Sequence, residues 1–167
     1  MPILDAHTLD LISHSAEQTR RLGARLGALL QAGDVLALEG ELGSGKTCLT
    51  QGIGQGMGVA GAITSPTFTL IAEHQPPAPA PPLYHIDLYR LDAPVAEAMA
   101  LGLDDYLLGD GVCVIEWADR IQAALPGERL WITLRHLGDS KRGILMQASG
   151  PRYDDLVEAF RQSAFGV

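Results

Sequence analysis

Long apolar runs and cysteines are both scarce in this sequence. No stretch of 18 or more uninterrupted apolar residues occurs, so no membrane span is predicted. Residues 1–10 hold acids but no basic cluster ahead of an apolar run, which is not the pattern of a secretory signal. The two cysteines, Cys48 and Cys113, lack metal-ligand spacing and make no disulfide framework. We therefore expect a reducing, cytoplasmic setting.

Basic residues are also in deficit. The chain has 12 Lys and Arg against 20 Asp and Glu, for a formal net charge of -8. A protein that clamps nucleic acid by itself usually presents a basic face, because neutralising phosphates supplies most of the affinity. The balance therefore argues against independent nucleic-acid binding. It leaves two interpretations of the acidity: ordinary solubility, or pairing with a basic partner.

The length and the apolar content of the chain fit one compact domain. With 167 residues, 47% of them apolar, the chain can form a single domain over 1–167 with a full core. A capping box at Ser15–Gln18 and leucines at helical spacing predict a helix that Gly33 closes. A second helix is expected over 46–57, where repeated glycines indicate either close packing or a frayed end.

Short apolar runs predict the strands of a buried sheet. The strands are expected at 35–38, 68–72, 83–89 and 112–115, and further helices at 92–101 and 153–161. The alternation in 130–134 and the run 143–148 predict an antiparallel hairpin at the sheet's edge. The segment 75–82, QPPAPAPP, is too rich in proline for a helix or a ladder and should be an exposed loop. This order predicts an α/β domain with a mainly parallel sheet and an antiparallel edge hairpin.

The strongest chemical signal is the segment Gly40–Thr47, which matches the phosphate-loop pattern G-x-x-x-x-G-K-[ST]. Phosphate oxygens need backbone N–H donors close by, and Gly43 and Gly45 keep the loop bare for that approach. Lys46 should reach the β- and γ-phosphates and act in catalysis, and the Thr47 hydroxyl should ligate magnesium. A buried strand before the motif and a helix after it argue against a chance match. The residues expected to bind the nucleotide, ATP, are Gly43, Ser44, Gly45, Lys46, Thr47 and Cys48.

Two carboxylates stand where such a site needs acids. The apolar strand 112–115 closes on Glu116, and His85 and Asp87 lie two residues apart on one face of another strand. An acid at a neighbouring strand end is needed to hold the metal, directly or through water. The residue types alone do not divide metal binding and water positioning between Glu116 and Asp87. A strand histidine such as His85 is more often a hydrogen-bonded structural residue.

Taken in order, the stretches GELGSGKT, SPTFTL, YHIDLYRL and VIEW resemble the TsaE family of bacterial ATPases. That family works in making threonylcarbamoyladenosine in tRNA. The resemblance runs from near Ser15 to about Arg120 and more loosely over the C-terminal hairpin. It implies a three-layer P-loop NTPase fold, ATP as the nucleotide, Thr47 and Glu116 as magnesium ligands, and Asp87 as the acid needed for turnover.

The resemblance also implies moving parts and partners. SPTF, Ser65–Phe68, is similar to a first switch segment and HIDLYR to a second, although composition alone allows a plain turn at Thr64–Thr67. The family acts beside two partner proteins that transfer the threonylcarbamoyl group to tRNA adenosine, so tRNA would be met only indirectly. One departure is Cys48, which stands where the family usually has a second threonine; its backbone N–H survives the change.

Two other functions compete with the ATPase hypothesis. A small-molecule kinase needs basic side chains around the transferred phosphoryl group, and Arg120 is the only base between Asp104 and Glu128. A nucleotide-gated binding module would use ATP only to set its shape, with negligible turnover. A GTPase is less favoured, since the chain has no Asn/Thr-Lys-x-Asp motif.

Overall fold

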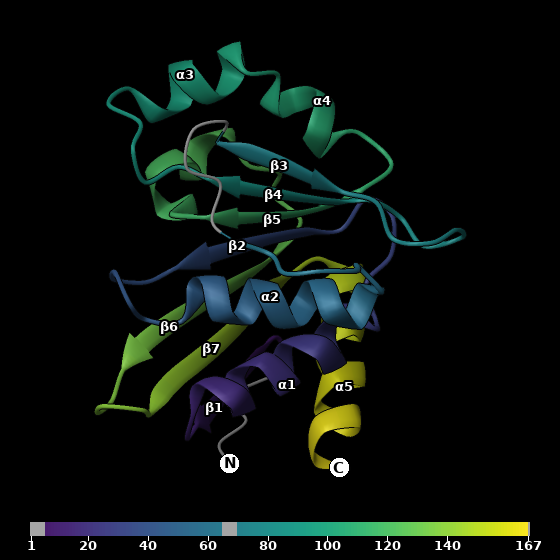
Figure 1. Cartoon of the computed structure of the whole chain (residues 1–167), viewed down its shortest axis with the longest axis vertical. Helices are drawn as coiled ribbons and strands as arrows, with labels where there is room; N and C mark the ends of the chain where they lie inside the picture. The colour runs from purple at the N-terminus through teal and green to yellow at the C-terminus, as the bar shows by residue number, and fades with distance from the viewer. Residues whose placement is uncertain (1–5, 65–69, 167) are drawn as a thin grey trace.

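A seven-stranded sheet runs through the computed structural model, which describes residues 6–64 and 70–166 (Figure 1). The strand order is β1-β7-β6-β2-β5-β4-β3. The four central strands β6, β2, β5 and β4 run parallel, and β1, β7 and β3 are antiparallel to their neighbours. The strands are β1 (Thr8–Ser13), β2 (Val35–Glu39), β3 (Ile71–His74), β4 (Leu83–Asp87), β5 (Val112–Glu116), β6 (Arg129–His136) and β7 (Arg142–Ser149).

Helices cover both faces of the sheet, which makes the expected three layers of the P-loop fold (Figure 1). One face packs against α1, α2 and α5, and the other against α3, α4 and the 3-10 segment η1. Leu36 and Leu38 of β2 point to the first layer, while Val35 and Ala37 point to the second, as strand alternation requires. The helices are α1 (Ala16–Gly27), α2 (Lys46–Met57), α3 (Pro94–Ala100), α4 (Leu103–Leu107), η1 (Ala118–Ala124) and α5 (Pro151–Phe165).

The first helix begins where the sequence predicts and ends earlier. The Ser15 hydroxyl accepts a hydrogen bond from the Gln18 N–H at 3.0 Å, and the Gln18 side chain returns to the N–H of His14 rather than of Ser15. The helix ends at Gly27, not at Gly33. The reason is the buried carboxylate of Asp34, which accepts the Gln31 N–H at 2.7 Å and organises a turn in its place.

The glycines of α2 mark close packing, not a frayed end. A Cβ on Gly52 would lie 2.1 Å from the carbonyl oxygen of Arg20 in α1, and a Cβ on Gly27 would lie 2.2 Å from that of Ile53. The two helix backbones therefore touch with no side chain between them. This contact brings the start of α1, with Ala16 and Thr19, beside the start of α2.

Several element boundaries differ from the sequence expectation. The strand expected at 68–72 is β3, and it lies at Ile71–His74; residues 65–69 lie outside the described residues. The strand expected at 83–89 stops at Asp87, because the Asp87 carboxylate accepts the Tyr89 N–H at 3.0 Å and turns the chain. The last helix, expected at 153–161, extends over Pro151–Phe165.

Three elements were not expected at all: β1, α4 and η1. The helix expected at 92–101 begins at Pro94, and its cap position is Ala93, whose N–H donates to the Glu97 carboxylate at 2.8 Å. The proline-rich stretch 75–82 is neither helix nor strand, as expected. Among the described residues, no helix is long and apolar enough to cross a membrane.

Candidate functional site

The phosphate-loop motif lies between the carboxyl end of β2 and the first turn of α2. Gly43 and Gly45 have φ angles of 75° and 107°, a region that residues with a Cβ seldom adopt. A Cβ at either position would meet no described atom closer than 3.5 Å. The positive φ angles therefore favour glycine at both positions. This is a second reason for glycine, besides the open approach to the backbone amides that the sequence suggests. Gly45 also caps α2 without a side chain, so none competes for the first amides of the helix.

Lys46 is held at the centre of the loop. Its Nζ donates to the carbonyl oxygens of Gly40 at 2.5 Å and Glu41 at 2.8 Å, and lies 4.1 Å from the centre of the Trp117 ring. Burial lowers the pKa of Lys46, and the nearby carboxylates, that of Glu116 first, oppose this shift. Lys46 therefore supplies a positive charge that is shielded from water and has carboxylates on one side of it.

The two acids lie on neighbouring parallel strands at the same height. Asp87 of β4 is the register partner of Glu116 of β5. The Thr47 hydroxyl donates to Glu116 Oε1 at 3.1 Å, and Nε2 of the fully buried His85 hydrogen-bonds to Glu116 Oε2. Burial raises the pKa of Asp87, although the Tyr89 N–H acts against this rise. The structure thus brings Lys46, Thr47, Glu116 and Asp87 together, as the sequence predicts.

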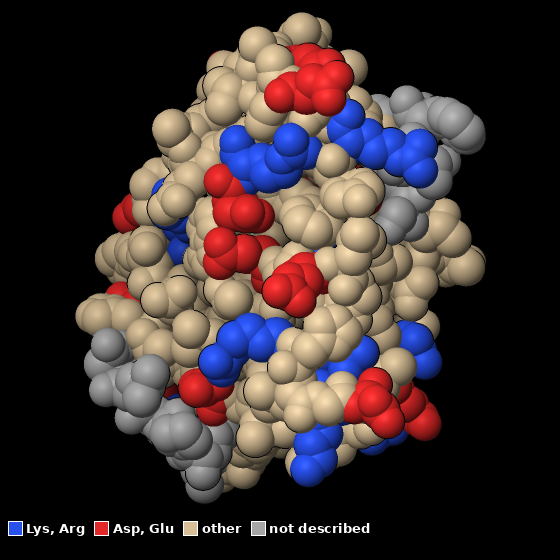
Figure 2. Space-filling model, turned by 90° about the vertical axis from the view of Figure 1, so that its left-hand side faces the viewer, with Lys and Arg blue, Asp and Glu red and all other residues tan. Residues whose placement is uncertain are grey.

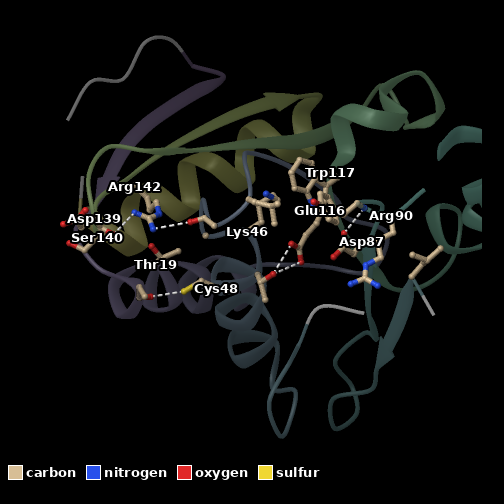
Figure 3. Close-up of a pocket in the computed structure, with 17 residues that line it drawn as sticks. Thr19, Lys46, Cys48, Asp87, Arg90, Glu116, Trp117, Asp139, Ser140 and Arg142 are labelled. Atoms are coloured by element: carbon tan, nitrogen blue, oxygen red, sulfur yellow. Dashed lines mark hydrogen bonds between the residues drawn. The ribbon is translucent and has the colours of Figure 1, made fainter. Parts of the chain in front are cut away.

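These residues line one pocket of about 580 Å³ (Figure 3). Asp87, Glu116, Trp117 and Arg90 stand at one end, Lys46 lies between, and Arg142 stands at the other end near Asp139, Ser140 and Thr19. Figure 2 looks onto the carboxyl ends of the central strands and shows acidic side chains gathered in the middle, with Lys and Arg side chains above and below. The pocket therefore lies where parallel α/β sheets usually bind ligands.

The other predicted phosphate-loop residues are also in place. Ser44 is fully buried, with its hydroxyl 3.4 Å from Lys46 Nζ. The Cys48 thiol lines the pocket and turns toward α1, where it donates to the Ala16 carbonyl at 3.1 Å and accepts from Arg20 at 3.4 Å. Burial, more than any other cause, raises the pKa of Cys48. The thiol is therefore part of the α1–α2 contact, a role that the sequence did not indicate.

Arg142 and Trp117 are among the pocket residues that sequence reasoning missed. Arg142 begins β7, yet its guanidinium donates to the Gly43 carbonyl at 3.2 Å, and only the fold brings these distant positions together. Trp117 has φ 62° directly after Glu116, a conformation seldom adopted by a residue with a bulky side chain. The only sequence signal for it was an aromatic residue following the acid. Arg120, the one base between Asp104 and Glu128, does not line the pocket and donates to the Leu88 and Tyr89 carbonyls.

The oxygens at Thr47 and Glu116 fit a magnesium ion that arrives with a nucleotide. Magnesium prefers oxygen ligands, usually one or two from protein and the rest from phosphates and water. A hydroxyl and a carboxylate oxygen already within 3.1 Å of each other offer two such ligands. Within residues 6–64 and 70–166, no group of three or more His, Cys, Asp or Glu could hold a metal alone.

Comparisons with known proteins agree on one family. A family model described as threonylcarbamoyl adenosine biosynthesis protein TsaE matches residues 13–144. The TsaE protein of Bacillus subtilis is 44% identical over 142 residues, covering 85% of this chain and 87% of that protein. The TsaE protein of Treponema pallidum is 43% identical, over 80% of this chain and 96% of the relative. A crystal structure of Bacillus subtilis YdiB superposes with a TM-score of 0.77 at 40% identity, over 93% and 95% of the two chains.

Proposed function

The chain belongs to the TsaE family, and on that premise we propose that it binds ATP with magnesium and hydrolyses it to support threonylcarbamoyladenosine modification of tRNA. One observation carries the proposal: the Thr47 hydroxyl meets the Glu116 carboxylate directly beside Lys46 and Asp87. A phosphate loop, a metal-binding pair and a second acid are the parts that hydrolysis of a nucleoside triphosphate requires. We assign them to a single ATPase domain because one continuous sheet carries all of them.

Each residue has a defined task in this proposal. The amides from Gly43 to Cys48, in the loop and the first turn of α2, bind the phosphates, and Lys46 exchanges its loop carbonyls for the β- and γ-phosphate oxygens. Thr47 and Glu116 would hold magnesium, which would supply positive charge against the negative charge that develops on the phosphates during transfer. The Lys46 charge is desolvated by the surrounding loop, so it acts more strongly there than it would in water.

Asp87 is the residue proposed to act on the attacking water. Asp87 lies on the strand next to that of Glu116, and its carboxylate accepts a hydrogen bond from the Tyr89 N–H. Burial raises the pKa of Asp87 and so makes the carboxylate a better proton acceptor than an exposed one. Glu116, engaged by Thr47 and His85, is left to the metal.

The far end of the pocket is proposed to receive the nucleobase. The acids mark the end at which the γ-phosphate and magnesium lie, so the base must extend the other way along the pocket. That end is formed by Thr19 of α1 and by the β6–β7 turn with Arg142 (Figure 3). Arg142 is already committed to the Gly43 carbonyl, so it stabilises the loop more than it serves as a free cation.

Two partner proteins of the threonylcarbamoyl-transfer machinery complete the proposed function. Fast phosphoryl transfer usually needs a second cation beside the loop lysine. In the described pocket the bases besides Lys46 are Arg90 and the committed Arg142. A partner would add a further cation or close the pocket, and would also bind the tRNA that this acidic chain meets only indirectly.

Glu116→Ala and Asp87→Asn divide the proposed roles by experiment. Glu116→Ala should raise the magnesium concentration needed for half-maximal ATP hydrolysis by about tenfold or more, because a metal ligand is lost. Asp87→Asn should leave ATP binding and the magnesium requirement nearly unchanged and lower turnover by about a hundredfold or more. A magnesium titration that shifts equally for both variants would show that the division is wrong.

A small-molecule kinase remains the alternative that the same assay separates. Its acceptor lid would need free basic side chains, and the guanidinium of Arg120 is occupied by backbone carbonyls. Release of inorganic phosphate without any added acceptor supports the ATPase. Phosphate transfer only to an added small molecule would show that the chain is a kinase. Tight ATP binding with no turnover under any condition would support the nucleotide-gated binding module.

A further inference from the structure

His85 has a place in the site that a purely structural histidine would not need. It lies in the middle of β4, and strand alternation puts it on the same face as Leu83 and Asp87, toward α2. The residue is fully buried. Its Nε2 hydrogen-bonds to Oε2 of Glu116, which is itself almost fully buried.

The Glu116 carboxylate is held from two sides. Oε1 accepts the Thr47 hydroxyl from α2 at 3.1 Å, and Oε2 bonds with His85 from β4. A carboxylate on a strand end can rotate about its last bonds, and two donors on different elements remove that freedom. The orientation that results presents Oε1 to Thr47, the other proposed magnesium ligand.

The other ring nitrogen of His85, Nδ1, indicates that the ring is held for its Nε2 contact with Glu116. Nδ1 is buried and has no hydrogen-bond partner among the described residues. Buried polar atoms are usually satisfied, so a ring chosen only to fill space would more simply be apolar. The arrangement also fixes the tautomer, because the ring proton must be on Nε2 to donate to the carboxylate.

We propose that His85 is a positioning residue, whose Nε2–H orients Glu116 for the divalent cation of the ATP site. This inference rests on the proposed function, since the cation is the one that accompanies ATP. It assigns to His85 no contact with the nucleotide. The role resembles the partners that orient ligands around metal sites, whose loss typically weakens metal binding about 10- to 100-fold.

A matched pair of variants tests the donor without removing the polar side chain. Gln carries an amide nitrogen near the position of His Nε2, whereas the shorter Asn places its nitrogen near Nδ1. Binding of Mn²⁺ in the presence of a non-hydrolysable ATP analogue is measured by electron paramagnetic resonance on the full chain. His85→Asn should weaken Mn²⁺ binding about tenfold or more, and His85→Gln should restore it to within about threefold of the parent chain. Equal loss in both variants, or loss in neither, would overturn the proposal.

The ring proton gives a second test that needs neither nucleotide nor folded variants. Long-range ¹H–¹⁵N spectra of the unmodified chain should show His85 protonated at Nε2 and bare at Nδ1. The signal is assigned by its disappearance in His85→Gln, or by selective labelling if that variant does not fold. A proton on Nδ1 would refute the proposal. If the unmodified chain binds no Mn²⁺ with the nucleotide analogue, the ATP function fails instead, and the tautomer still decides whether His85 donates to Glu116.

Discussion

Lys46 is the residue on which nucleotide binding is expected to depend most. Replacing it with Met keeps the aliphatic stem beside Trp117 but removes the charge that the phosphates need. A charge-assisted hydrogen bond contributes about 1.5–3 kcal/mol, so ATP affinity should fall about 10- to 100-fold with the fold intact. Calorimetric titration with ATP and magnesium measures this. Arg161→Met, which removes a positive charge from a residue of α5 that does not line the pocket, is the control and should leave the affinity nearly unchanged; equal affinity for all three proteins would refute the phosphate-loop assignment.

The ionised Asp87 carboxylate, proposed to be needed for turnover, should lower the stability of the folded chain at pH 7. Burial raises its pKa above the ordinary 3.8, so its favourable contribution to folding is complete below pH 3.8 and is lost as the pH rises through the raised value. At pH 7 the parent chain therefore holds an ionised carboxylate that its surroundings disfavour. Asp87→Asn keeps an oxygen for the Tyr89 N–H and removes the charge.

The melting temperature of Asp87→Asn should therefore exceed that of the parent chain at pH 7 by about 1–3 °C. The advantage should disappear in acid, where both side chains are neutral. Thermal unfolding of both proteins at a series of pH values measures the sign of this difference in melting temperature. A variant that is less stable than the parent at pH 7 and equally so in acid would contradict the burial argument.

At the residue scale, the sequence predicted most of the site because its chemistry is local. Gly43 to Thr47 are adjacent in a loop whose geometry a motif encodes, and the sequence puts Glu116 directly after one buried strand and Asp87 within another. Arg142 could not be predicted in this way. Its contact with Gly43 depends on how the β6–β7 hairpin turns beside the loop, and no motif reports that register.

At the scale of elements, the contact between α1 and α2 positions the pocket wall. Gly52→Ala would push a methyl group against the Arg20 carbonyl of α1, since the built Cβ lies 2.1 Å from it. The variant should lose about 1–3 kcal/mol of unfolding free energy despite the better helix propensity of Ala. Urea denaturation measures the loss. Gly127→Ala, where no atom of the described chain lies within 4 Å of the added Cβ, should change stability by less than about 0.5 kcal/mol.

Elements with strong local signals were predicted well, and those that depend on tertiary contacts were not. Helix α2 was predicted with its observed bounds, since a strand, a phosphate loop and a left-handed Gly58 frame it. Strand β1 was missed because its ladder partner, β7, lies at the other end of the chain. The early end of α1 depends on the Asp34 carboxylate, whose other partner is Arg152 of α5. Periodicity within one segment carries no information on such partners.

At the scale of the whole molecule, charge is unevenly distributed. The segment 71–128, which forms β3 to β5 and the α3–α4–η1 layer, contains only two bases, Arg90 and Arg120, among many acids. The rest of the chain holds the basic residues of α1 and of the β6–β7 hairpin. The acidity of the segment 71–128 argues against direct tRNA binding there and fits association with a partner of opposite charge.

The most direct test of the central claim is steady-state phosphate release from ATP and magnesium by three mixtures. These are the chain alone, the chain with the two threonylcarbamoyl-transfer partners, and the full set with tRNA. The account predicts slow release by the chain alone and a rise of about a thousandfold when the partners supply a cation or close the pocket. Glu116→Ala should abolish the rise. Equal rates in all three mixtures would contradict the partner dependence, and no phosphate release in any of them would contradict ATP hydrolysis at this site.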